Sequence, residues 1–394
     1  MEPFLDMSTD TSRIPAHGLE LRSLITAQGE LRLWFERVPV PTPSAAEIVV
    51  QIEAAPVNPS DILTLLGPAD IATLTCETRT NSTDSATPVT TATVPANQLP
   101  SVAARLDLPL AIGNEGAGTV IAAGEQARHL LGRRVGLRSL HGTYAQYRLA
   151  AAAEVVVLPD GTAAAAGASA FINPLTALSM LETMRTEGHT AIIHTAAASN
   201  LGQMLVKLCA ADGVPLVNVV RSAAQAELLR GLGAQWVLDS SAPDFDAALV
   251  AAVDATHATL AFDAIGGGDM AQRLLVAMSE VATRRMTRYD RYGSPTHRQV
   301  YLYGTLDPRP TVLDRRFGMA WGIGGWLVTW RLQQFGPAVA ARMRERIAAE
   351  LDTTFASRYN ERIALEQLID PDTIRRFAKR ATGEKFLVVP APYA

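Results

Sequence analysis

The strongest structural signal in this chain is the stretch TAIIHTAAASNLGQMLVKLCAADGVPLVNVVR, residues 190–221. It reads as a short apolar strand, a turn of small residues, a helix and a second apolar strand. The same alternation continues, which predicts helices over 223–231 and 245–254 and strands over 235–238, 258–262 and 299–303. Alternation at this spacing indicates a parallel sheet with right-handed crossovers.

The turn of small residues predicts a site for phosphate groups. In a strand–turn–helix unit of this kind, the pyrophosphate of a dinucleotide binds at the N-terminus of the helix. The usual three glycines would fall on Ala197, Ser199 and Gly202, and only the last position is glycine. Ala197 and Ser199 are still small enough for the backbone to approach a phosphate. The alternative is an ordinary strand–helix–strand unit with a tight turn.

Arg221, which closes the second strand, predicts the kind of dinucleotide. It follows Gly202 by nineteen residues. An acidic residue there would accept a hydrogen bond from the ribose 2′-hydroxyl of NAD, whereas an arginine can pair with the 2′-phosphate of NADP. NADPH is therefore the expected cofactor.

The composition limits the class of protein. With 394 residues, of which 48% are hydrophobic and 19% charged, the chain should form two domains with a large core. A net charge of −4 gives no basic surface for nucleic acid. The longest apolar runs are interrupted by Gly, Arg or His, and the N-terminus lacks the pattern of a secretion signal, so we expect no membrane span. Two cysteines, Cys76 and Cys209, predict a reduced, cytoplasmic protein.

The residues before the nucleotide unit read mainly as β-structure. Apolar runs at 30–36 and 47–55 flank a proline-rich turn, and further strands are expected over 116–122, 134–136, 144–149 and 155–158. Residues 67–108 are rich in Thr, Ala, Pro and Ser and predict a long, partly mobile surface excursion, either a lid or partner surface or a tolerated insertion. Residues 283–298 contain five arginines, which could bind a phosphate or a coenzyme A tail or form a solvated loop.

Seven motifs follow one another in an order typical of one enzyme family. They are VNPSD at 57–61, GNEGAG at 113–118, GTYAQY at 142–147, NPLTA at 173–177, the unit at 190–221, FDAIGG at 262–267 and YLYG at 301–304. From about residue 20 to 394 the chain resembles the zinc-independent medium-chain dehydrogenases/reductases, in the branch of quinone oxidoreductases and enoyl reductases. The resemblance implies an α/β protein in which a GroES-like β-rich catalytic domain (1–165 and 350–394) is interrupted by a Rossmann-type NADPH-binding domain (166–349). The cofactor and substrate would lie in the cleft between them.

The resemblance also implies the residues that contact the cofactor. They are Asn173 and Thr176 beside the nicotinamide, Ser199, Asn200, Leu201 and Gly202 at the pyrophosphate, Arg221 at the 2′-phosphate, Tyr303 and Gly304 on the nicotinamide side, and Lys385 from the last segment. Asn173 is also a suitable N-cap for a helix that starts at Pro174. His194, at the end of the first strand, either approaches the cofactor or is a core histidine.

A metal site is not expected. Zinc-dependent members of the superfamily place a cysteine near the position of Asn58 and a His-Glu pair where this chain has Asn114 and Glu115. Two distant cysteines and scattered histidines cannot supply the ligands that zinc requires. The substrate must then be polarised by hydrogen bonds.

The proton donor is the open question in the sequence. Enoyl thioester reductases of this branch carry a tyrosine several residues after the NPSD motif, and residues 62–73 contain none; Thr64 is a poor acid. Tyr144, with Tyr289 and Tyr292 as substitutes, is the best candidate donor, and a strand starting there would place Tyr144 and Gln146 on one face and Tyr147 on the other. Asn58 could donate a hydrogen bond to a substrate carbonyl. Packing for Tyr144 and turn formation for Asn58 are the alternatives.

These observations predict an NADPH-dependent oxidoreductase that transfers hydride to quinones or other activated α,β-unsaturated carbonyls, with a small-molecule substrate. The alternatives are a 2-enoyl thioester reductase, whose arginine-rich loop grips coenzyme A, and a weakly catalytic NADPH-binding protein. We expect a homodimer, or a tetramer built from dimers, that pairs through an open strand edge at Gln299–Tyr303.

Overall fold

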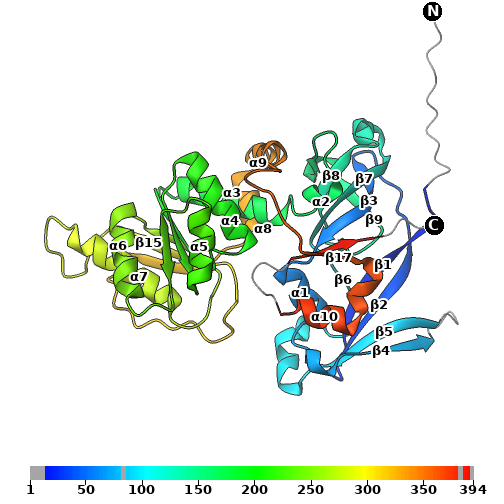
Figure 1. Cartoon of the computed structure of the whole chain (residues 1–394), viewed down its shortest axis with the longest axis horizontal. Coiled ribbons are helices and arrows are strands. Elements are labelled where there is room, and N and C mark those ends of the chain that lie inside the picture. The colour runs from blue at the N-terminus through cyan, green and yellow to red at the C-terminus, as the bar shows by residue number, and fades with distance from the viewer. Residues whose placement is uncertain (1–13, 81–85, 380–384, 391–394) are drawn as a thin grey trace, which may run out of the picture. The chain divides into compact units, whose positions relative to one another are not determined.

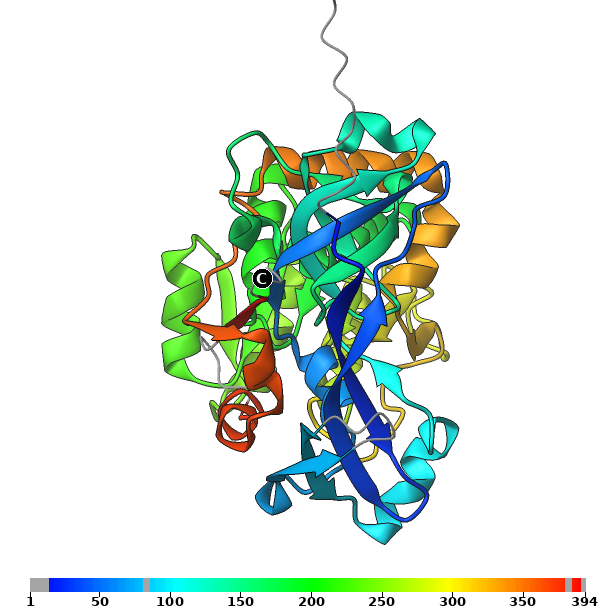
Figure 2. The same ribbon diagram turned by 90° about the vertical axis from the view of Figure 1, so that its right-hand side faces the viewer.

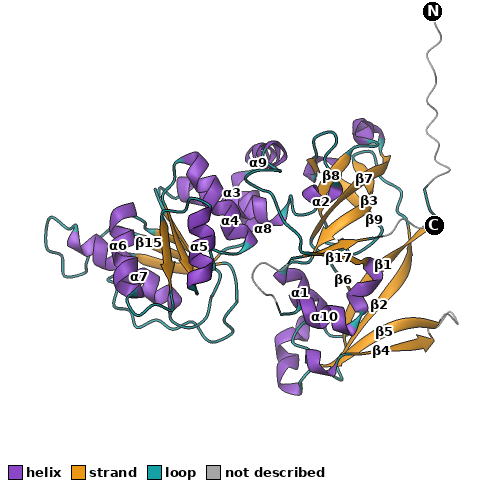
Figure 3. Cartoon of the chain, viewed as in Figure 1, coloured by secondary structure: helices purple, strands orange, loops and turns teal. Residues whose placement is uncertain are grey.

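The computed structural model describes residues 14–80, 86–379 and 385–390. The chain forms two compact units, one running to Ile172 and resuming at Ser357, the other comprising Asn173–Ala356. The first is rich in strands, and the second surrounds a single sheet with helices (Figure 3). The boundaries predicted at 166 and 350 lie seven residues before the observed ones at 173 and 357.

Antiparallel strands dominate the first unit. Five form a sheet in the order β4 (Thr75–Thr80), β5 (Ala86–Thr93), β2 (Glu30–Pro39), β1 (His17–Ile25) and β6 (Leu110–Ala111). Seven form a second sheet, in the order β10 (Val156–Val157), β8 (Arg134–Arg138), β7 (Glu115–Ala123), β3 (Glu47–Pro56), β18 (Phe386–Val389) and β17 (Glu361–Ala364), with β9 (Tyr147–Ala151) also paired to β3. β3 has neighbours on both sides, which explains its nearly continuous run of buried apolar residues.

Short helices close this unit. They are α1 (Pro59–Leu66), α2 (Ala164–Gly167) and α10 (Pro371–Phe377), with 3₁₀ segments at Ile71–Thr73, Ala96–Arg105, Glu125–Leu130, Ala152–Glu154 and Leu365–Ile369. α1 starts where it does because Pro59 suits the first helical position and the Asp61 carboxylate accepts the Asn58 backbone N–H at 2.9 Å. Residues from β1, β3, α1, β18 and the 365–377 region share one apolar core.

The segment 67–108 is more regular than predicted. Strands β4 and β5 form a hairpin that pairs with β2, so the segment extends the five-stranded sheet (Figure 2). The Thr90 hydroxyl donates to the Ile369 carbonyl, and Arg375 donates to the Leu74 carbonyl at 2.9 Å. The hairpin is therefore fixed to the C-terminal part of its unit, and residues 81–85 of the predicted excursion lie outside the described residues.

The second unit contains the predicted parallel sheet. Its six strands run in the order β13 (Trp236–Asp239), β12 (Leu216–Val220), β11 (Ile192–His194), β14 (Leu260–Asp263), β15 (Arg298–Leu302) and β16 (Trp321–Gly325). All neighbouring pairs are parallel. The predicted order of strands and helices over 190–262 is confirmed, and the bounds predicted at 223–231, 235–238, 245–254 and 258–262 each lie within two residues of the observed ones.

Helices cover both faces of this sheet. They are α3 (Ile172–Thr186), α4 (Asn200–Asp212), α5 (Ala223–Gly231), α6 (Phe245–Thr256), α7 (Met270–Arg284), α8 (Val328–Phe335) and α9 (Pro337–Ala349). α6 and α7 lie on one side and α5 on the other (Figure 1). The apolar faces of α6 and α7 bury Phe245, Leu249 and Leu274 against the strands.

The expectation of an open edge at Gln299–Tyr303 is wrong. β15 is paired on both sides, with β14 and with β16. The sequence of β16, WGIGG, contains three glycines, which outweigh the strand preference of Trp321 and Ile323, so its pattern gave no strand signal. β16 is the terminal strand of the sheet as described.

The arginine-rich loop follows α7 and precedes β15, at the amino end of the sheet. Arg298 is fully buried and donates to the carbonyls of Ser294 (3.1 Å) and Phe317 (2.8 Å). Arg285 donates to Asp254 at 2.8 Å, and Arg284 pairs with Glu280. Ligands of open parallel sheets bind at the opposite, carboxyl end, so this position disfavours a role for the loop in gripping coenzyme A.

One helical stretch is apolar enough to deserve comparison with a membrane span. Among the described residues, the stretch Ala164–Thr186 is long and apolar enough to cross a membrane, judged by length and composition only. Its most apolar 18-residue window has a mean hydropathy of 1.3. The interrupted apolar runs of the sequence had predicted no such stretch. Of that window 78% is buried inside the protein, which is typical of a core helix.

Candidate functional site

Four strand ends form a row along the carboxyl edge of the six-stranded sheet. Strands β12, β11, β14 and β15 are parallel neighbours, so the residues that follow them lie side by side. Arg221 follows β12, Thr195 follows β11, Ala264 follows β14 and Tyr303 follows β15. The strand order reverses between β11 and β14, and open α/β sheets bind ligands at such a reversal.

The turn after β11 prepares the N-terminus of α4. Ser199 is the N-cap, and its hydroxyl accepts the Gly202 backbone N–H at 3.1 Å. A Cβ at Gly202 would lie 2.1 Å from the Ala197 carbonyl oxygen, so only glycine fits there. Asn200 and Leu201 stand in the first turn, where backbone N–H groups and the helix dipole favour an anion.

The sequence did not reveal which residue of this turn has an unusual backbone. Ala196 adopts a left-handed conformation with φ of 51°. The first two glycines of the usual motif would instead fall on Ala197 and Ser199. The Ala197 N–H donates to the Val219 carbonyl at 3.1 Å, which fixes the turn onto β12. The turn therefore has the small residues typical of a phosphate site, although alanine and serine replace its first two glycines.

A buried Thr–Asp pair, which the sequence analysis missed, joins the ends of β11 and β14. The Thr195 hydroxyl donates to Asp263 at 2.6 Å and accepts the Ala264 N–H at 2.8 Å. The Asp263 carboxylate also accepts the N–H groups of Ile265 (2.9 Å) and Gly266 (3.2 Å). The sequence did contain a signal for this pair, because Asp263 directly follows the apolar run Leu260–Phe262. A carboxylate buried at the end of such a strand needs several hydrogen-bond donors.

Arg221 stands exposed at the end of β12, as predicted. Its backbone N–H donates to the Gln225 side chain at 3.1 Å. Ser222 beside it is the N-cap of α5 and accepts the Gln225 N–H at 3.4 Å. A guanidinium, a hydroxyl and a helix N-terminus together form a donor set that suits a phosphate.

His194 and Tyr303 form a buried pair at the ends of β11 and β15. His194 Nε2 and the Tyr303 hydroxyl share a hydrogen bond of 2.6 Å, and the rings stack with centroids 5.8 Å apart. Burial lowers the pKa of His194 to about 3 and raises that of Tyr303, so both side chains stay neutral. His194 Nδ1 has no partner among the described residues. A Cβ on the adjoining Gly304 would lie 2.5 Å from the Ala264 carbonyl oxygen.

Helix α3 starts earlier than predicted. It begins at Ile172, so Asn173 lies in the first turn and is not the N-cap. The Glu115 carboxylate fills that role, because its Oε2 accepts the N–H groups of Phe171 (3.0 Å) and Ile172 (2.7 Å). Thr176, one turn on, is buried. Contact of Asn173 and Thr176 with a nicotinamide stays a prediction.

Four buried or half-buried polar side chains form one cluster in the first unit. Asn58 Nδ2 donates to Glu115 Oε1 at 2.9 Å. Asp61 Oδ1 accepts the Asn114 backbone N–H at 2.9 Å and its side-chain amide at 2.6 Å. Burial is the main cause that raises the pKa of Asp61, to about 7, and it also raises that of Glu115. Asn58 and Glu115 therefore orient each other through the hydrogen bond between the amide and the carboxylate.

Tyr144, the candidate proton donor, is buried and its hydroxyl is engaged within the protein. It is 1% exposed, and its hydroxyl donates to the Pro56 carbonyl at 3.0 Å. The expected alternation along 144–149 is absent because β9 starts only at Tyr147, and Tyr144, Gln146 and Tyr147 are all buried. Burial, reinforced by the Asp61 carboxyl, raises the pKa of Tyr144, which makes it a poor acid. The packing alternative for Tyr144 is supported.

Lys385 enters the same region from the C-terminal segment. Its ammonium donates to the Ser169 hydroxyl at 2.7 Å and lies 5.4 Å from the centre of the Tyr359 ring. The Tyr359 hydroxyl donates to Ser169 at 2.8 Å. The charges of Glu115 and Asp61 face the ammonium.

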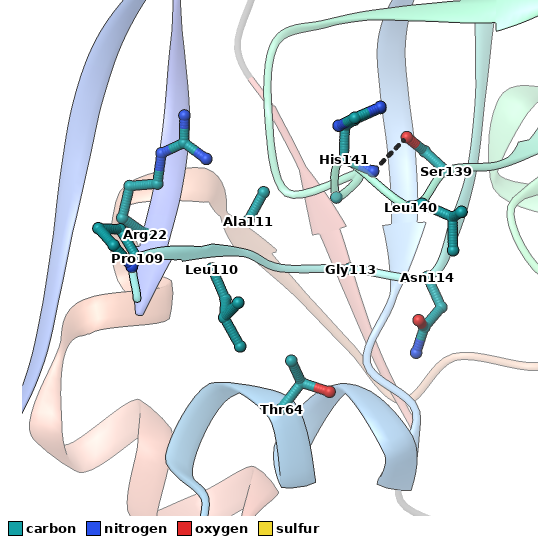
Figure 4. Close-up of a pocket in the computed structure, with 11 residues that line it drawn as sticks. Arg22, Thr64, Pro109, Leu110, Ala111, Gly113, Asn114, Ser139, Leu140 and His141 are labelled. Carbon is teal, nitrogen blue, oxygen red and sulfur yellow. Dashed lines mark hydrogen bonds between the residues drawn. The ribbon is translucent and has the colours of Figure 1, made fainter. Parts of the chain in front are cut away.

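A pocket of about 350 Å³ adjoins this cluster (Figure 4). Its lining includes Thr64 of α1, Leu110, Asn114 and His141, and Leu110 and Thr64 point toward each other across it. Asn114 connects the pocket with Asp61. The volume suits a small molecule, and the amide and hydroxyl groups suit a carbonyl oxygen.

We predict that removal of divalent metal leaves any activity unchanged. Positions 58 and 114 carry amides, and no group of three or more His, Cys, Asp or Glu side chains within residues 14–80, 86–379 and 385–390 is arranged to hold a metal ion. Metal analysis and rates with and without a chelator test this. One equivalent of bound zinc, or inactivation by the chelator, would contradict it.

We predict that Asp61→Asn removes part of the pH dependence of stability. The folded-state pKa of Asp61, about 7, exceeds the ordinary 3.8, so the folded protein binds the proton more tightly. Its contribution is therefore favourable at low pH and is lost as pH rises from about 4 to about 7, by up to roughly 4 kcal/mol. Denaturant unfolding at pH 5 and pH 8 measures the effect.

The matched control for Asp61→Asn is Asp160→Asn, whose carboxylate is exposed. The free energy of unfolding of Asp61→Asn, relative to that of wild type, should be higher at pH 8 than at pH 5. The same difference for Asp160→Asn should not change with pH. An equal loss of stability in wild type and Asp61→Asn would contradict the prediction.

Comparison with curated proteins finds partial matches. The chain is 31% identical over 162 residues to a quinone oxidoreductase of Pseudomonas aeruginosa, which covers 40% of this chain and 50% of that protein. It is 30% identical over 218 residues to a mitochondrial enoyl-[acyl-carrier-protein] reductase of Xenopus tropicalis, which covers 52% and 51%. The chain thus spans about half the length of these relatives. No family model matches it.

Comparison with solved structures covers nearly the whole chain. A putative NADPH:quinone reductase from Mesorhizobium loti aligns with a TM-score of 0.66 and 23% identity over 96% of this chain and 99% of that one. The CurK enoyl reductase aligns with a TM-score of 0.68 and 16% identity over 95% and 99%. The predicted fold class, a GroES-like β-rich part combined with a Rossmann-type part, is confirmed, and so is the resemblance on which it rested.

Proposed function

From this relationship to the quinone oxidoreductases and enoyl reductases of the medium-chain dehydrogenase/reductase family, we propose that the chain is an NADPH-dependent reductase of quinones or other activated α,β-unsaturated carbonyl compounds. The observation that carries the proposal is the row of phosphate-binding features along one sheet edge. Ser199, Gly202 and the N-terminus of α4 suit a pyrophosphate, and Arg221 with Ser222 suits a 2′-phosphate. A mycobacterial protein of the same fold, 20% identical, has been solved with NADPH.

NADPH, when bound, supplies a hydride to the acceptor. The residues of this chain hold the cofactor and stabilise the negative charge that hydride addition builds on the acceptor oxygen. In the pocket of Figure 4, the Asn114 amide and the Thr64 hydroxyl are the groups of suitable chemistry. They donate to Ser60 and Asp61 in this structure and would have to exchange these bonds to serve an acceptor oxygen. The Glu115 carboxylate orients the Asn58 amide, and Asp61 orients Asn114.

Reduction of 2-enoyl thioesters is the second candidate. It is supported by the relative from Xenopus tropicalis, named an enoyl-[acyl-carrier-protein] reductase. Residues 62–73 contain no tyrosine, however, and the arginine-rich loop lies at the amino end of its sheet. These two features favour acceptors that need neither a strong acid near Thr64 nor an arginine clamp.

Three acceptors with the same cofactor test the proposal. A quinone, a simple enone and an enoyl thioester are each mixed with NADPH and the full chain, and NADPH oxidation is followed by absorbance. We expect turnover with the quinone and the enone and slower turnover with the thioester. Preference for the thioester would favour the second candidate. NADPH binding without oxidation would favour a weakly catalytic nucleotide-binding protein.

We also propose that the chain forms a homodimer, or a tetramer of dimers, through β16. This strand ends the six-stranded sheet, and its open side offers unpaired backbone groups to a second copy. Gly324→Lys adds a charge on this strand, and its Cβ would make only ordinary contacts, 3.9 Å from Tyr301. We expect this variant to be monomeric by light scattering.

Gly231→Lys is the control for the dimer, because this helical glycine has no neighbour within 4 Å of a Cβ. It should assemble like wild type. A monomeric wild-type chain at micromolar concentration would contradict the proposed dimer.

A further inference from the structure

Lysine is rare in this chain. Of 35 lysine and arginine residues, only Lys207, Lys379 and Lys385 are lysines. An exposed charge can be carried by either side chain, but only lysine can lose its proton near neutral pH when it is buried. A lysine inside a polar cluster of a chain that otherwise uses arginine therefore indicates a function that needs a transferable proton.

The Lys385 ammonium is held by two hydroxyl side chains in series. Its Nζ donates to Ser169 Oγ at 2.7 Å, and the Tyr359 hydroxyl donates to the same oxygen at 2.8 Å. Ser169 is buried and Tyr359 is half-buried. If the ammonium loses a proton, the Ser169 hydroxyl can turn to donate to the neutral amine while it still accepts from Tyr359. The three groups thus form a path along which a proton can return to Lys385.

The charged groups around Lys385 come from separate elements. Glu115 lies on β7, Asp61 lies on α1, and Tyr359 precedes β17. Burial lowers the pKa of Lys385 to about 8, while the charges of Glu115 and Asp61 oppose this shift. A group with this pKa is largely protonated at pH 7 and is a far stronger acid than an exposed lysine.

We propose that Lys385 is the proton donor of the reduction and that Ser169 and Tyr359 form the relay that returns a proton to it. This assignment rests on the proposed reductase function. It goes beyond the cofactor contact that the family resemblance implies for Lys385. The other groups of the cluster suit the task less well. Asn58 and Asn114 are amides, and the Tyr144 hydroxyl donates to the Pro56 carbonyl. The carboxyl oxygens of Asp61 and Glu115 accept backbone N–H groups and side-chain amides, which leaves them little room to carry and donate a proton.

Reduction of an enone adds a hydride, taken from NADPH, to the β-carbon, and the electron pair of the carbon–carbon double bond moves to give an enolate. An N–H bond of Lys385 then breaks, and its proton forms the O–H or α-C–H bond of the product. The neutral amine takes the Ser169 proton, Ser169 takes the Tyr359 proton, and Tyr359 is reprotonated by water. NADP⁺ and the saturated carbonyl compound are released.

The titration of Lys385 can be measured without cofactor or substrate. Reductive methylation with ¹³C-formaldehyde labels three lysines and the N-terminal amine, and the resonance that disappears in Lys385→Arg belongs to Lys385. We expect its chemical shift to titrate with a midpoint near 8. Glu115→Gln, which removes a facing carboxylate, should lower this midpoint further. A midpoint near 10.4, the ordinary value for lysine, would overturn the assignment.

Kinetics separate proton donation from cofactor binding. Lys385→Arg keeps a positive charge but cannot donate its proton, so kcat with the enone should fall about 10²- to 10⁴-fold, while NADPH affinity, read by fluorescence titration, changes less than about threefold. Ser169→Ala and Tyr359→Phe should give smaller losses of kcat and a larger solvent isotope effect. Lys379→Arg is the matched control and should behave like wild type.

These experiments distinguish a failure of the proton-donor assignment from a failure of the proposed reductase function. If the wild-type chain reduces the enone and Lys385→Met keeps its kcat but loses NADPH affinity, Lys385 is a cofactor ligand and the donor assignment is wrong, while the reductase function stands. If the wild-type chain oxidises NADPH with none of the acceptors, the reductase function fails first, and the donor assignment falls with it.

Discussion

Gly202→Ala is expected to weaken NADPH binding more than tenfold and to lower the free energy of unfolding by about 1–3 kcal/mol. The added Cβ would lie 2.1 Å from the Ala197 carbonyl oxygen, which is backbone and cannot move aside as a side chain can. The turn and the first turn of α4 must therefore shift apart, and the N–H groups that would hold the pyrophosphate shift with them. Fluorescence titration with NADPH and denaturant unfolding measure the two effects.

The control for this variant is Gly231→Ala in α5. No atom lies within 4 Å of a Cβ placed there, so the substitution should be neutral or stabilising by up to about 1 kcal/mol. If Gly202→Ala binds NADPH as tightly as Gly231→Ala, the turn after β11 is not the pyrophosphate site.

Arg221→Ala is expected to weaken NADPH binding by tenfold to more than a hundredfold and to leave NADH binding nearly unchanged. The guanidinium at the end of β12 would make a charge-assisted contact with the 2′-phosphate, and loss of such a contact costs about 1.5–3 kcal/mol. NADH lacks this phosphate and so loses nothing. Parallel titrations of wild type and variant with both cofactors give the comparison.

Arg230→Ala is the matched control for Arg221, because Arg230 is also an exposed arginine and pairs with Glu227 in the last turn of α5. Its affinity for NADPH should equal that of wild type. Equal affinity of the wild-type chain for NADPH and NADH would refute the assignment of Arg221 to the 2′-phosphate.

The alternating strands and helices of residues 190–262 could be predicted because their signals are local. The periodicity of residues 190–262 placed each strand and helix in order, and α5 has the predicted bounds, Ala223–Gly231. Ser199, Gly202 and Arg221 were found for the same reason, since each takes its place from the strand or helix beside it. Local patterns also explain why β16 was not predicted, because three glycines weaken the strand signal of Trp321 and Ile323.

The polar cluster could not be predicted because its partners are far apart in sequence. Glu115 accepts hydrogen bonds from Asn58, 57 residues earlier, and from Phe171, 56 residues later. Lys385 reaches Ser169 across 216 residues. No periodicity reports such pairings, which depend on how β3, β7 and β18 assemble. The two alternatives for Tyr144, proton donor and packing residue, stayed open for this reason: its motif was visible, but the burial that engages its hydroxyl was not.

Two of the terminal strands, β4 and β16, differ in how readily another strand could add to them. β4 ends the five-stranded sheet and carries Glu77 and Arg79 on its exposed edge, and such charges discourage another strand from adding there. β16 carries no charged side chain. The charges of β4 thus protect that edge of the five-stranded sheet, whereas β16 leaves the edge of its sheet receptive to a strand from a second copy.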